Sequence, residues 1–323
     1  MVAPLDWGLG HATRCIPIVN DLIKGGYKVI IAASAQTEVL LKKEFPQLLF
    51  LQLPGYNISY TKNKFWLPLK ILQQLPKIFY AIKTENKWLQ QKIDEQKIDA
   101  VISDNRPGLY SKKAKCIYIT HQLTIKAKLS FIENWLQKIH YKYINKFSEC
   151  WIPDYEGENN LAGDLSHPQK LPKTPVQYIG PLSRFVKKEL PVIYDAAIIL
   201  SGPEPQRTIF ENIILAQIKH TAKKLVLVRG LPNQPSNKKM NYPNVVCYNF
   251  LNSEELNNLL FQAKIIICRS GYSSIMDLEA VQKKAVIVAT PGQTEQEYLA
   301  KTLAQKNKHI IAYQNNFDLL KYI

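Results

Sequence analysis

Short apolar runs alternate with amphipathic segments along most of the chain. In the first half, the runs at 27–34 and 98–104 indicate buried strands, and residues 66–97 and 124–147 have helical patterns. The second half repeats the alternation, for example with the strand-like run at 264–270. Continuous apolar strands that alternate with helices are typical of parallel sheets covered on both faces. The pattern therefore predicts an α/β protein.

A segment with two prolines and several charges, residues 181–193, separates the two halves and is typical of a linker. We therefore predict two Rossmann-like, doubly wound domains that face each other across a cleft. The expected domains are residues 1–182 and 193–323, with the linker at about 183–192. Within the second half, Ser253 is the expected N-cap of the helix that follows it.

Composition narrows the class of protein. The 323 residues suffice for one large or two ordinary domains. No apolar run approaches the length that spans a bilayer, and the N-terminus has neither the basic nor the apolar region of a signal peptide. The five cysteines have no metal-ligand spacing, and their odd number argues against a disulfide framework. We therefore expect a cytoplasmic protein.

The formal net charge of +16 predicts attraction to something anionic, such as nucleic acid, an acidic membrane face or a phosphate-rich ligand. The alternative is a lysine-rich composition with solvated lysines spread over the surface. No helix-turn-helix, zinc finger or single-strand recognition motif is present, so we expect no nucleic-acid partner.

Unusual residues gather where the predicted strands end. In open α/β sheets, ligands bind outside the carboxyl ends of the strands. These ends carry the segments 8–14, 104–106, 121, 201–207, 269–271 and 290–296. Their position is the strongest indication of a functional site in the sequence.

The first of these segments reads GLGHATR. Glycines at a strand-to-helix turn let the backbone approach a ligand, and a helix N-terminus favours an anion. His11 is then placed to take a proton from a hydroxyl near neutral pH, with Asp104 fixing its tautomer. The alternatives are a histidine that only caps the turn and an aspartate that only starts one. Arg14 is expected to face solvent or to steady the loop. The predicted acceptor-side residues are Gly8, Gly10, Asn105, Arg106 and His121.

Three segments of the second half suit phosphate, ribose and sugar hydroxyl groups. A small turn at 201–208 fits a phosphate, with Arg207 as a bidentate partner. A Ser-Gly turn precedes the helix of Asp277, whose carboxylate can accept from ribose hydroxyls. Glutamine and glutamate side chains at 290–300 can bind sugar hydroxyls. The predicted donor-binding residues are Ser201, Gly202, Arg207, Arg269, Ser270, Gly271, Tyr272, Asp277, Gln293, Glu295 and Gln296.

Each segment also has an interpretation as an ordinary helix start. Ser201 and Pro205 would then begin a helix, and Ser270 would be an N-cap. Thr294 and Glu297 have the spacing of a capping box.

Residues 268–300 resemble the donor-binding stretch of the bacterial lipid-linked N-acetylglucosaminyltransferases of peptidoglycan synthesis, which have the GT-B fold. GLGHATR resembles the N-terminal glycine loop of that family. It also resembles the Gly-His turn of natural-product glycosyltransferases, whose histidine acts as a base with an aspartate about a hundred residues on. His11 and Asp104 have that spacing. ISDNRPGLY, THQL and SGPEPQRT resemble a further bacterial branch of predicted glycosyltransferases.

The resemblance implies an inverting, metal-independent transfer of a sugar from a nucleotide diphosphate donor, expected to be a UDP-sugar, to an acceptor hydroxyl. His11 would deprotonate the acceptor and Asp104 would orient His11. Backbone amides near 201–202 and 271–272, with Arg207 or Arg269, would stabilise the leaving diphosphate. The nucleotide sugar is a substrate, and no cofactor is expected. No Asp-x-Asp motif or His/Cys cluster suggests a metal site.

Lysines and aromatic residues mix in residues 61–92. This segment could lie on an anionic membrane face and admit a lipid-linked acceptor, which would place the protein at the inner face of the membrane. The alternative is core packing of the aromatics with solvated lysines. Its aromatics are Phe65, Trp66, Phe79, Tyr80 and Trp88, and its prolines, Pro68 and Pro76, can both sit at helix starts.

Two other functions fit the same fold. A nucleotide-sugar 2-epimerase would release the free epimer without any acceptor. A catalytically silent donor-binding subunit would bind the nucleotide, and the His11→Ala substitution would cause no loss of function.

Overall fold

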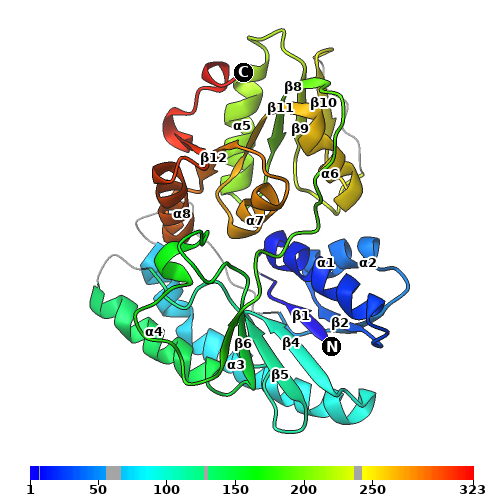
Figure 1. Ribbon diagram of the computed structural model, residues 1–323, viewed down its shortest axis with the longest axis vertical. Helices are drawn as coiled ribbons and strands as arrows, with labels where there is room; N and C mark the ends of the chain where they lie inside the picture. Colours follow the sequence, from blue (N-terminus) through cyan, green and yellow to red (C-terminus); the bar gives the residue numbers. More distant parts are fainter. Residues whose placement is uncertain (7, 56–66, 127–129, 236–241) are drawn as a thin grey trace. The chain divides into compact units, whose positions relative to one another are not determined.

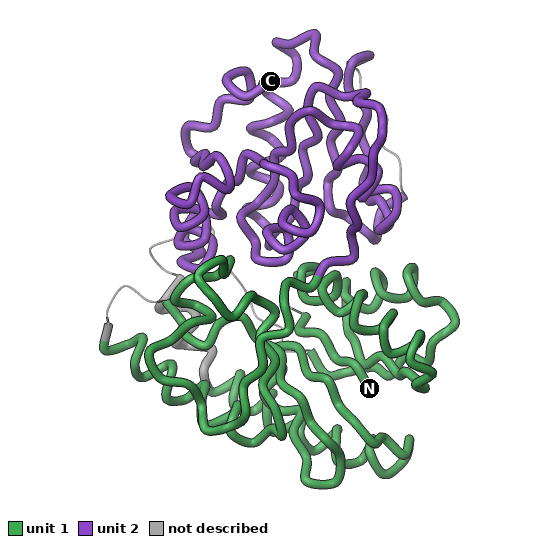
Figure 2. The backbone as a smooth tube through the Cα atoms, in the orientation of Figure 1, with its two compact units in different colours: residues 1–61, 65–182 green, residues 62–64, 183–323 purple. Residues whose placement is uncertain are grey.

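A computed structural model describes residues 1–6, 8–55, 67–126, 130–235 and 242–323, with the side chains of 67–75 and 130 outside the description. The described residues form two compact units, one within residues 1–182 and the other within residues 183–323 (Figure 2). Each unit is described separately below.

Unit 1 is built on a sheet of seven parallel strands in the order β3-β2-β1-β4-β5-β6-β7 (Figure 1). Its strands are β1 (Val2–Pro4), β2 (Ile30–Ala33), β3 (Leu49–Gln52), β4 (Ala100–Asp104), β5 (Lys115–Ile119), β6 (Glu149–Ile152) and β7 (Val176–Tyr178). Its α-helices are α1 (Leu9–Lys24), α2 (Ala35–Glu44), α3 (Leu67–Gln96) and α4 (Ser130–Ile144). On one face of the sheet, Leu89 and Ile93 of α3 and Ile144 of α4 join the strand residues in one apolar core.

Unit 2 has a sheet of six parallel strands in the order β10-β9-β8-β11-β12-β13. Its strands are β8 (Tyr194–Ile199), β9 (Leu225–Val228), β10 (Val245–Tyr248), β11 (Ala263–Arg269), β12 (Ala285–Ala289) and β13 (Ile310–Tyr313). Its α-helices are α5 (Gln206–Ile218), α6 (Ser253–Gln262), α7 (Tyr272–Ala280) and α8 (Thr294–Gln305).

Both faces of the second sheet are covered. Along β8, Ala196 and Ile198 pack in the core that contains Phe210 of α5. The residue between them, Ala197, packs instead with Leu259 of α6. Because successive strand side chains point to opposite faces, α5 and α6 cover opposite faces of the sheet. This two-sided burial explains why the strands are continuously apolar in the sequence.

Each sheet reverses its strand order at one point. In unit 1 the order reverses between β1 and β4, and in unit 2 between β8 and β11. The loops that follow these strands diverge to opposite faces, which leaves a crevice at the carboxyl edge for a ligand. The register pairs Pro4, the last residue of β1, with Asp104, the last residue of β4. The parallel pairing of β1 with β4 therefore brings the segments that follow both strands to the same point of the carboxyl edge.

The structure confirms the predicted α/β class with two doubly wound parallel sheets. Three predicted details are wrong. The N-cap of α6 is Asn252, not Ser253, and Asn252 forms a capping box with Glu255. Pro76 lies inside α3 and starts no helix. The helix expected over 124–147 begins at Ser130 and ends at Ile144.

The predicted helix starts at 270 and 294 also differ in their caps. Gly271 is the N-cap of α7, and Gln293 is the N-cap of α8, and neither helix has a side-chain cap. Glu297 accepts a hydrogen bond from the backbone N–H of Gly292 at 2.9 Å, so it does not form a capping box with Thr294. In the described part of the chain, no helix combines the length and the apolar character needed to cross a membrane.

Candidate functional site

The first candidate site lies at the strand-order reversal of unit 1. The chain leaves β1 and enters α1 through Gly8, which is exposed and has φ +119°. A side chain at this φ would be strained, although a Cβ there would meet no atom within 4 Å. The turn places His11 in the first turn of α1. Asp104 approaches it from the end of the adjacent strand, β4.

His11 and Asp104 are in contact, as predicted. The Nδ1 atom of His11 is 3.1 Å from Oδ2 of Asp104. The Asp104 side chain is fully buried, whereas that of His11 is 18% exposed. Among the described residues, Nε2 of His11 has no hydrogen-bond partner. A ring nitrogen held by a carboxylate on one side and open on the other is the arrangement of a general base.

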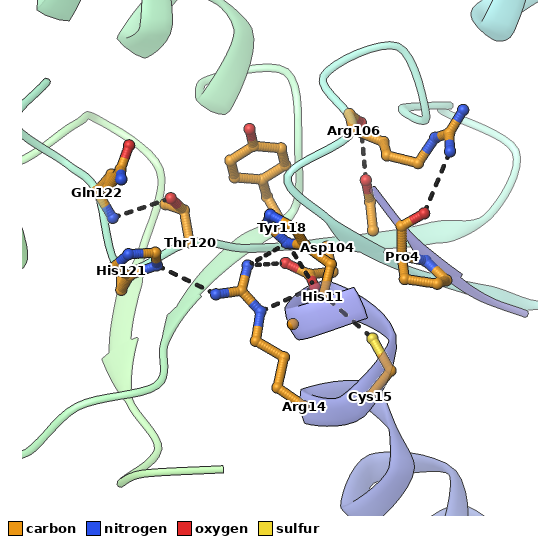
Figure 3. Close-up of polar contacts among 12 residues, drawn as sticks. Pro4, His11, Arg14, Cys15, Asp104, Arg106, Tyr118, Thr120, His121 and Gln122 are labelled. Atoms are coloured by element: carbon orange, nitrogen blue, oxygen red, sulfur yellow. Dashed lines mark hydrogen bonds and ion pairs between the residues drawn. The ribbon is translucent and has the colours of Figure 1, made fainter. Parts of the chain in front are cut away.

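Arg14 completes the site, and its place corrects the expectation that it faces solvent or only steadies the loop. It is 2% exposed, and its guanidinium lies between Asp104 and His121 (Figure 3). Its Nε donates to Oδ2 of Asp104 at 2.8 Å, and one of its terminal amino groups donates to Oδ1 of the same carboxylate. The other terminal amino group is 3.1 Å from Nδ1 of His121. Arg14 therefore binds Asp104 in a bidentate pair, the strongest geometry for this type of contact.

The charges around Asp104 keep it ionised. Burial alone would raise the pKa of Asp104, but the guanidinium of Arg14 and the imidazole of His11 outweigh burial and hold the pKa well below its usual range. The thiol of Cys15 also points at the carboxylate, with 3.8 Å between Sγ and Oδ2. Burial and the charge of Asp104 raise the pKa of Cys15 well above its usual value. Cys15 is therefore a neutral donor here.

Nδ1 of His11 has two neighbours of opposite character. Asp104 is an acceptor, and a terminal amino group of Arg14 is a donor 2.9 Å away. A protonated Nδ1 donates to Asp104, while a bare Nδ1 accepts from Arg14. Arg14 and His11 thus share the carboxylate of Asp104.

The other acceptor-side residues differ in their accessibility. Gly10 and Asn105 are partly exposed at the carboxyl edge. His121 is buried against Arg14 and supports it. Arg106 was predicted on the acceptor side but is fully buried.

Arg106 has a structural role. It donates to Glu85 of α3 at 2.5 Å, to the carbonyl of Pro4 at 3.1 Å and to the carbonyl of Pro54 at 2.6 Å. Its partners come from three different segments, so it fixes the turn after Asp104. The prediction that it faces an acceptor is wrong, because every one of these contacts lies in the interior.

The second candidate site lies at the carboxyl edge of unit 2. The hydroxyl of Ser270 donates to the carbonyl of Gln296 at 2.9 Å, and Oε1 of Gln296 accepts from the backbone N–H of Thr290 at 3.0 Å. A Cβ on Gly202 would lie 3.6 Å from Oγ1 of Thr290, and a Cβ on Gly271 would lie 4.0 Å from Nε2 of Gln296. The turns after β8, β11 and β12 therefore meet, as the sequence predicted for their loops.

The helices that start from these turns share one property. The N-caps of α5, α7 and α8 are Pro205, Gly271 and Gln293, and none supplies a side-chain cap. The first N–H groups of a helix need partners, and the helix dipole favours an anion at that end. At α5 the backbone N–H of Thr208 is already bound to the carboxylate of Glu204 at 3.2 Å, so the N-termini of α7 and α8 are the two that suit an anionic ligand at this edge. Of the predicted donor residues there, Ser201, Gln293 and Glu295 are partly exposed and Gly202 is exposed.

Arg207 and Arg269 do not lie where the sequence suggested. Arg207 is 6% exposed and donates to Glu204, Glu211 and Thr208 at 2.6, 2.7 and 2.7 Å. Arg269 is 1% exposed, stacks on the Phe210 ring at 4.4 Å, and donates to Gln314 at 2.5 Å. Burial lowers the pKa of Arg269 to about 10. Both guanidinium groups are bound within unit 2, so the prediction that they hold a diphosphate is not supported by their contacts.

Two more predicted donor residues lie inside unit 2: Tyr272 is buried, and Asp277 has a hydrogen-bond partner within the unit. Tyr272 is 3% exposed. Oδ1 of Asp277 accepts from the hydroxyl of Ser183, the first residue of unit 2, at 2.6 Å. Burial raises the pKa of Asp277 to about 6, against the opposing effects of Arg184 and the Ser183 hydrogen bond. A ligand hydroxyl at this carboxylate would share it with Ser183 or replace it.

Sequence reasoning missed Arg14 and Thr290. Arg14 follows His11 by three residues, a spacing that places both on one face of a helix, so the helical pattern held a usable signal. Thr290 lies in the predicted segment 290–296 but was not among the predicted donor residues, because its nearness to Gly202 depends on the approach of a distant strand. In the described parts of the chain, no cluster of three or more His, Cys, Asp or Glu side chains is arranged to hold a metal ion.

Comparisons with known proteins agree with this organisation. Residues 197–322 match the glycosyltransferase family 28 C-terminal domain. No curated protein matches the chain in sequence. The glycotransferase of kitacinnamycin has a similar fold, with a TM-score of 0.63 and 13% identity over 98% of this chain and 86% of its own.

Two further solved structures share the fold. Acinetobacter baumannii MurG aligns with a TM-score of 0.52 and 14% identity, over 98% of this chain and 86% of its own. The spinosyn rhamnosyltransferase SpnG, complexed with thymidine diphosphate, aligns with a TM-score of 0.57 and 13% identity, over 96% and 85%. The domain match and the two doubly wound sheets define a glycosyltransferase of the GT-B fold. Within that class, unit 2 carries a family 28 C-terminal domain, and the chain resembles the MurG family.

Loss of Arg14 is expected to destabilise unit 1 strongly. Arg14→Met leaves the buried carboxylate of Asp104 without its guanidinium partner, which costs about 3–5 kcal/mol of unfolding free energy. All five tryptophans lie within residues 1–182, so tryptophan fluorescence in urea reports on unit 1 alone. Lys24→Met, an exposed change on the same helix, should alter stability by less than about 0.5 kcal/mol. A loss of similar size in both variants would contradict the role given to Arg14.

The raised pKa of Asp277 predicts a pH-dependent stability of unit 2. Between the ordinary aspartate pKa of about 4 and a native pKa of about 6, the folded protein holds a proton that the unfolded chain has released. Stability therefore falls as the pH rises through this window, by at most about 3 kcal/mol. Asp277→Asn should remove the fall and be more stable than the wild type at pH 8. Calorimetric melts at pH 5 and pH 8 test this, with Glu189→Gln as an exposed control.

Proposed function

We propose that the protein is an inverting, metal-independent glycosyltransferase that moves a sugar from a nucleotide diphosphate donor to an acceptor hydroxyl. The observation that carries the proposal is the His11 imidazole, bound through Nδ1 to a buried carboxylate while Nε2 is open. The domain match supplies the reaction class. His11 is the base, and Asp104 and Arg14 are positioning residues.

In the proposed reaction, Nε2 of His11 removes the proton of the acceptor hydroxyl. The acceptor oxygen forms a bond to the anomeric carbon on the face opposite the diphosphate, and the bond from that carbon to the diphosphate oxygen breaks. The nucleotide diphosphate leaves with the bonding electrons. Attack from the opposite face inverts the configuration of the anomeric carbon.

Unit 2 supplies the donor half of this proposal. The N-termini of α7 and α8, which have no side-chain cap, lie at the turns 270–271 and 290–296, beside the turn at 201–202. Their fixed N–H dipoles would stabilise the developing charge of the leaving diphosphate. The donor in the proposal is a UDP-sugar. The thymidine diphosphate bound to the spinosyn enzyme makes a dTDP-sugar the first alternative.

The proposed acceptor is lipid-linked and is reached from the inner face of the membrane. Its support is a set of exposed aromatic side chains on α3 and α4, amid exposed lysines such as Lys77 and Lys138. Tyr143 of α4 and Ile78 of α3 pack on the same buried pair, which places the two helices side by side. The exposed aromatics are Phe79 (40%), Tyr80 (73%), Phe131 (68%) and Trp135 (47%). Trp88 packs on the core instead, and Phe65 and Trp66 lie outside the described residues.

His11→Asn is expected to retain donor binding and lose transfer. Removal of a general base lowers the rate by roughly 10²–10⁴-fold. Calorimetric titration with UDP and dTDP would measure binding, and nucleotide release from UDP-sugars with a panel of soluble and lipid-linked acceptors would measure transfer. Lys24→Met serves as the control on the same helix.

The outcomes separate the proposal from its alternatives. Nucleotide binding without transfer in the wild type would support a catalytically silent subunit. Full transfer activity in His11→Asn would refute the role of His11 as the base. Release of an epimerised sugar nucleotide without an acceptor would identify an epimerase. Absence of any nucleotide binding by the wild type would refute the proposed donor site.

The membrane contact predicts a loss of vesicle binding in Phe131→Ser/Trp135→Ser. When the two aromatic side chains are buried in the membrane interface, they contribute several kcal/mol to binding. Partition of the double variant onto vesicles of neutral and anionic phospholipid should therefore fall by about tenfold or more. Tyr27→Ser, which removes an aromatic that is 67% exposed elsewhere in unit 1, should bind as the wild type does. Equal loss in both variants, or no vesicle binding by the wild type, would refute the membrane contact.

A further inference from the structure

Thr290 carries a buried hydroxyl that the protein itself does not use. It follows β12 at the carboxyl edge of unit 2 and is 1% exposed. Its backbone is fully bound, since its N–H donates to Gln296 at 3.0 Å and its carbonyl accepts from Gln293 at 3.1 Å. Its Oγ1 has no hydrogen-bond partner among the described residues.

The hydroxyl faces the turn that leads into α5. A Cβ on Gly202 would lie 3.6 Å from Oγ1 of Thr290, which makes Thr290 the nearest neighbour of that position. Gly202 has φ +101°, where a side chain would be strained, and it is exposed. Glycine therefore leaves the backbone of this turn bare beside the buried hydroxyl.

A helix without a side-chain cap begins close to this point. Thr290 precedes α8, a helix of 12 residues whose N-cap, Gln293, makes no side-chain cap. The turn at Gly202 leads into α5, where the backbone N–H of Thr208 is already bound to the carboxylate of Glu204 at 3.2 Å. An anion placed here would therefore meet the N–H dipoles of α8 and one free hydroxyl donor.

An unpartnered buried hydroxyl lowers the stability of the free protein. Valine has almost the same shape and would fill the site without a polar atom, so the hydroxyl is unfavourable for folding alone. Groups of this kind are satisfied when a ligand brings the missing partner. The carboxyl edge of the sheet is also where a ligand of this fold class is expected.

We propose that the Thr290 hydroxyl donates a hydrogen bond to a phosphate oxygen of the nucleotide diphosphate in the donor site. This inference rests on the proposed function and adds a specific contact to it. The bond forms only in the complex, so Thr290 stabilises the bound state and destabilises the free one.

Thr290→Val and Thr290→Ser test the inference as a matched pair. Thr290→Val keeps the shape and removes the hydroxyl, while Thr290→Ser keeps the hydroxyl. We expect Thr290→Val to raise the melting temperature of the ligand-free protein and to weaken UDP binding by roughly 10- to 100-fold, the usual effect of losing a hydrogen bond to a charged group. Thr290→Ser should bind UDP within about threefold of the wild type. Calorimetric titration with UDP, with dTDP and GDP in parallel, gives the affinities.

Equal UDP affinity in Thr290→Val and the wild type would overturn the inference without touching the proposed function. If the melting temperature of Thr290→Val were also lower, the hydroxyl would serve the fold. Failure of the wild type to bind UDP, dTDP or GDP would refute the donor site as a whole, and so is distinguishable from that result.

Discussion

The buried charge of Asp104 is the constraint on which unit 1 depends. A carboxylate at the end of a central strand cannot stay ionised in the interior unless cations and donors surround it. His11 and Arg14 provide that environment from the first two turns of α1, and His121 holds the far side of the guanidinium. The same contacts that make burial tolerable also fix the imidazole. Stability and the orientation of the base therefore come from one set of interactions.

The helices of unit 2 differ in how the backbone N–H groups at their N-termini are satisfied. The helix α6 satisfies its own N-terminus through the capping box of Asn252 and Glu255. The helices α7 and α8, which follow β11 and β12, have no side-chain cap, whereas at α5 the carboxylate of Glu204 accepts from the backbone N–H of Thr208. An internal cap would compete with a ligand for the same N–H groups. Its absence at α7 and α8, and its presence at α6 nearer the sheet edge, fits a division between ligand-facing and structural helix ends.

The sequence predicted the fold well because apolar alternation depends on local pattern. Parallel strands buried on both faces must be apolar throughout, and the strand order then follows from right-handed connections. His11 and Asp104 were also predictable, since both stand at strand ends on adjacent strands. The arginines were not. A guanidinium beside a glycine turn looks like a phosphate ligand, yet Glu211 and Gln314, the partners that draw Arg207 and Arg269 inward, are distant or unremarkable in the sequence.

The burial of several arginines in ion pairs affects how the protein attracts anions. Arg14, Arg106 and Arg207 are buried against Asp104, Glu85 and Glu211, so each guanidinium is largely neutralised at short range. The net charge of +16 consequently acts through side chains outside these pairs, many of them exposed lysines. Solvated lysines supply a long-range field that is screened by salt, whereas backbone dipoles at helix ends act only on contact. Attraction to an anionic surface and recognition of a diphosphate therefore rest on different groups, and each can change in sequence without loss of the other.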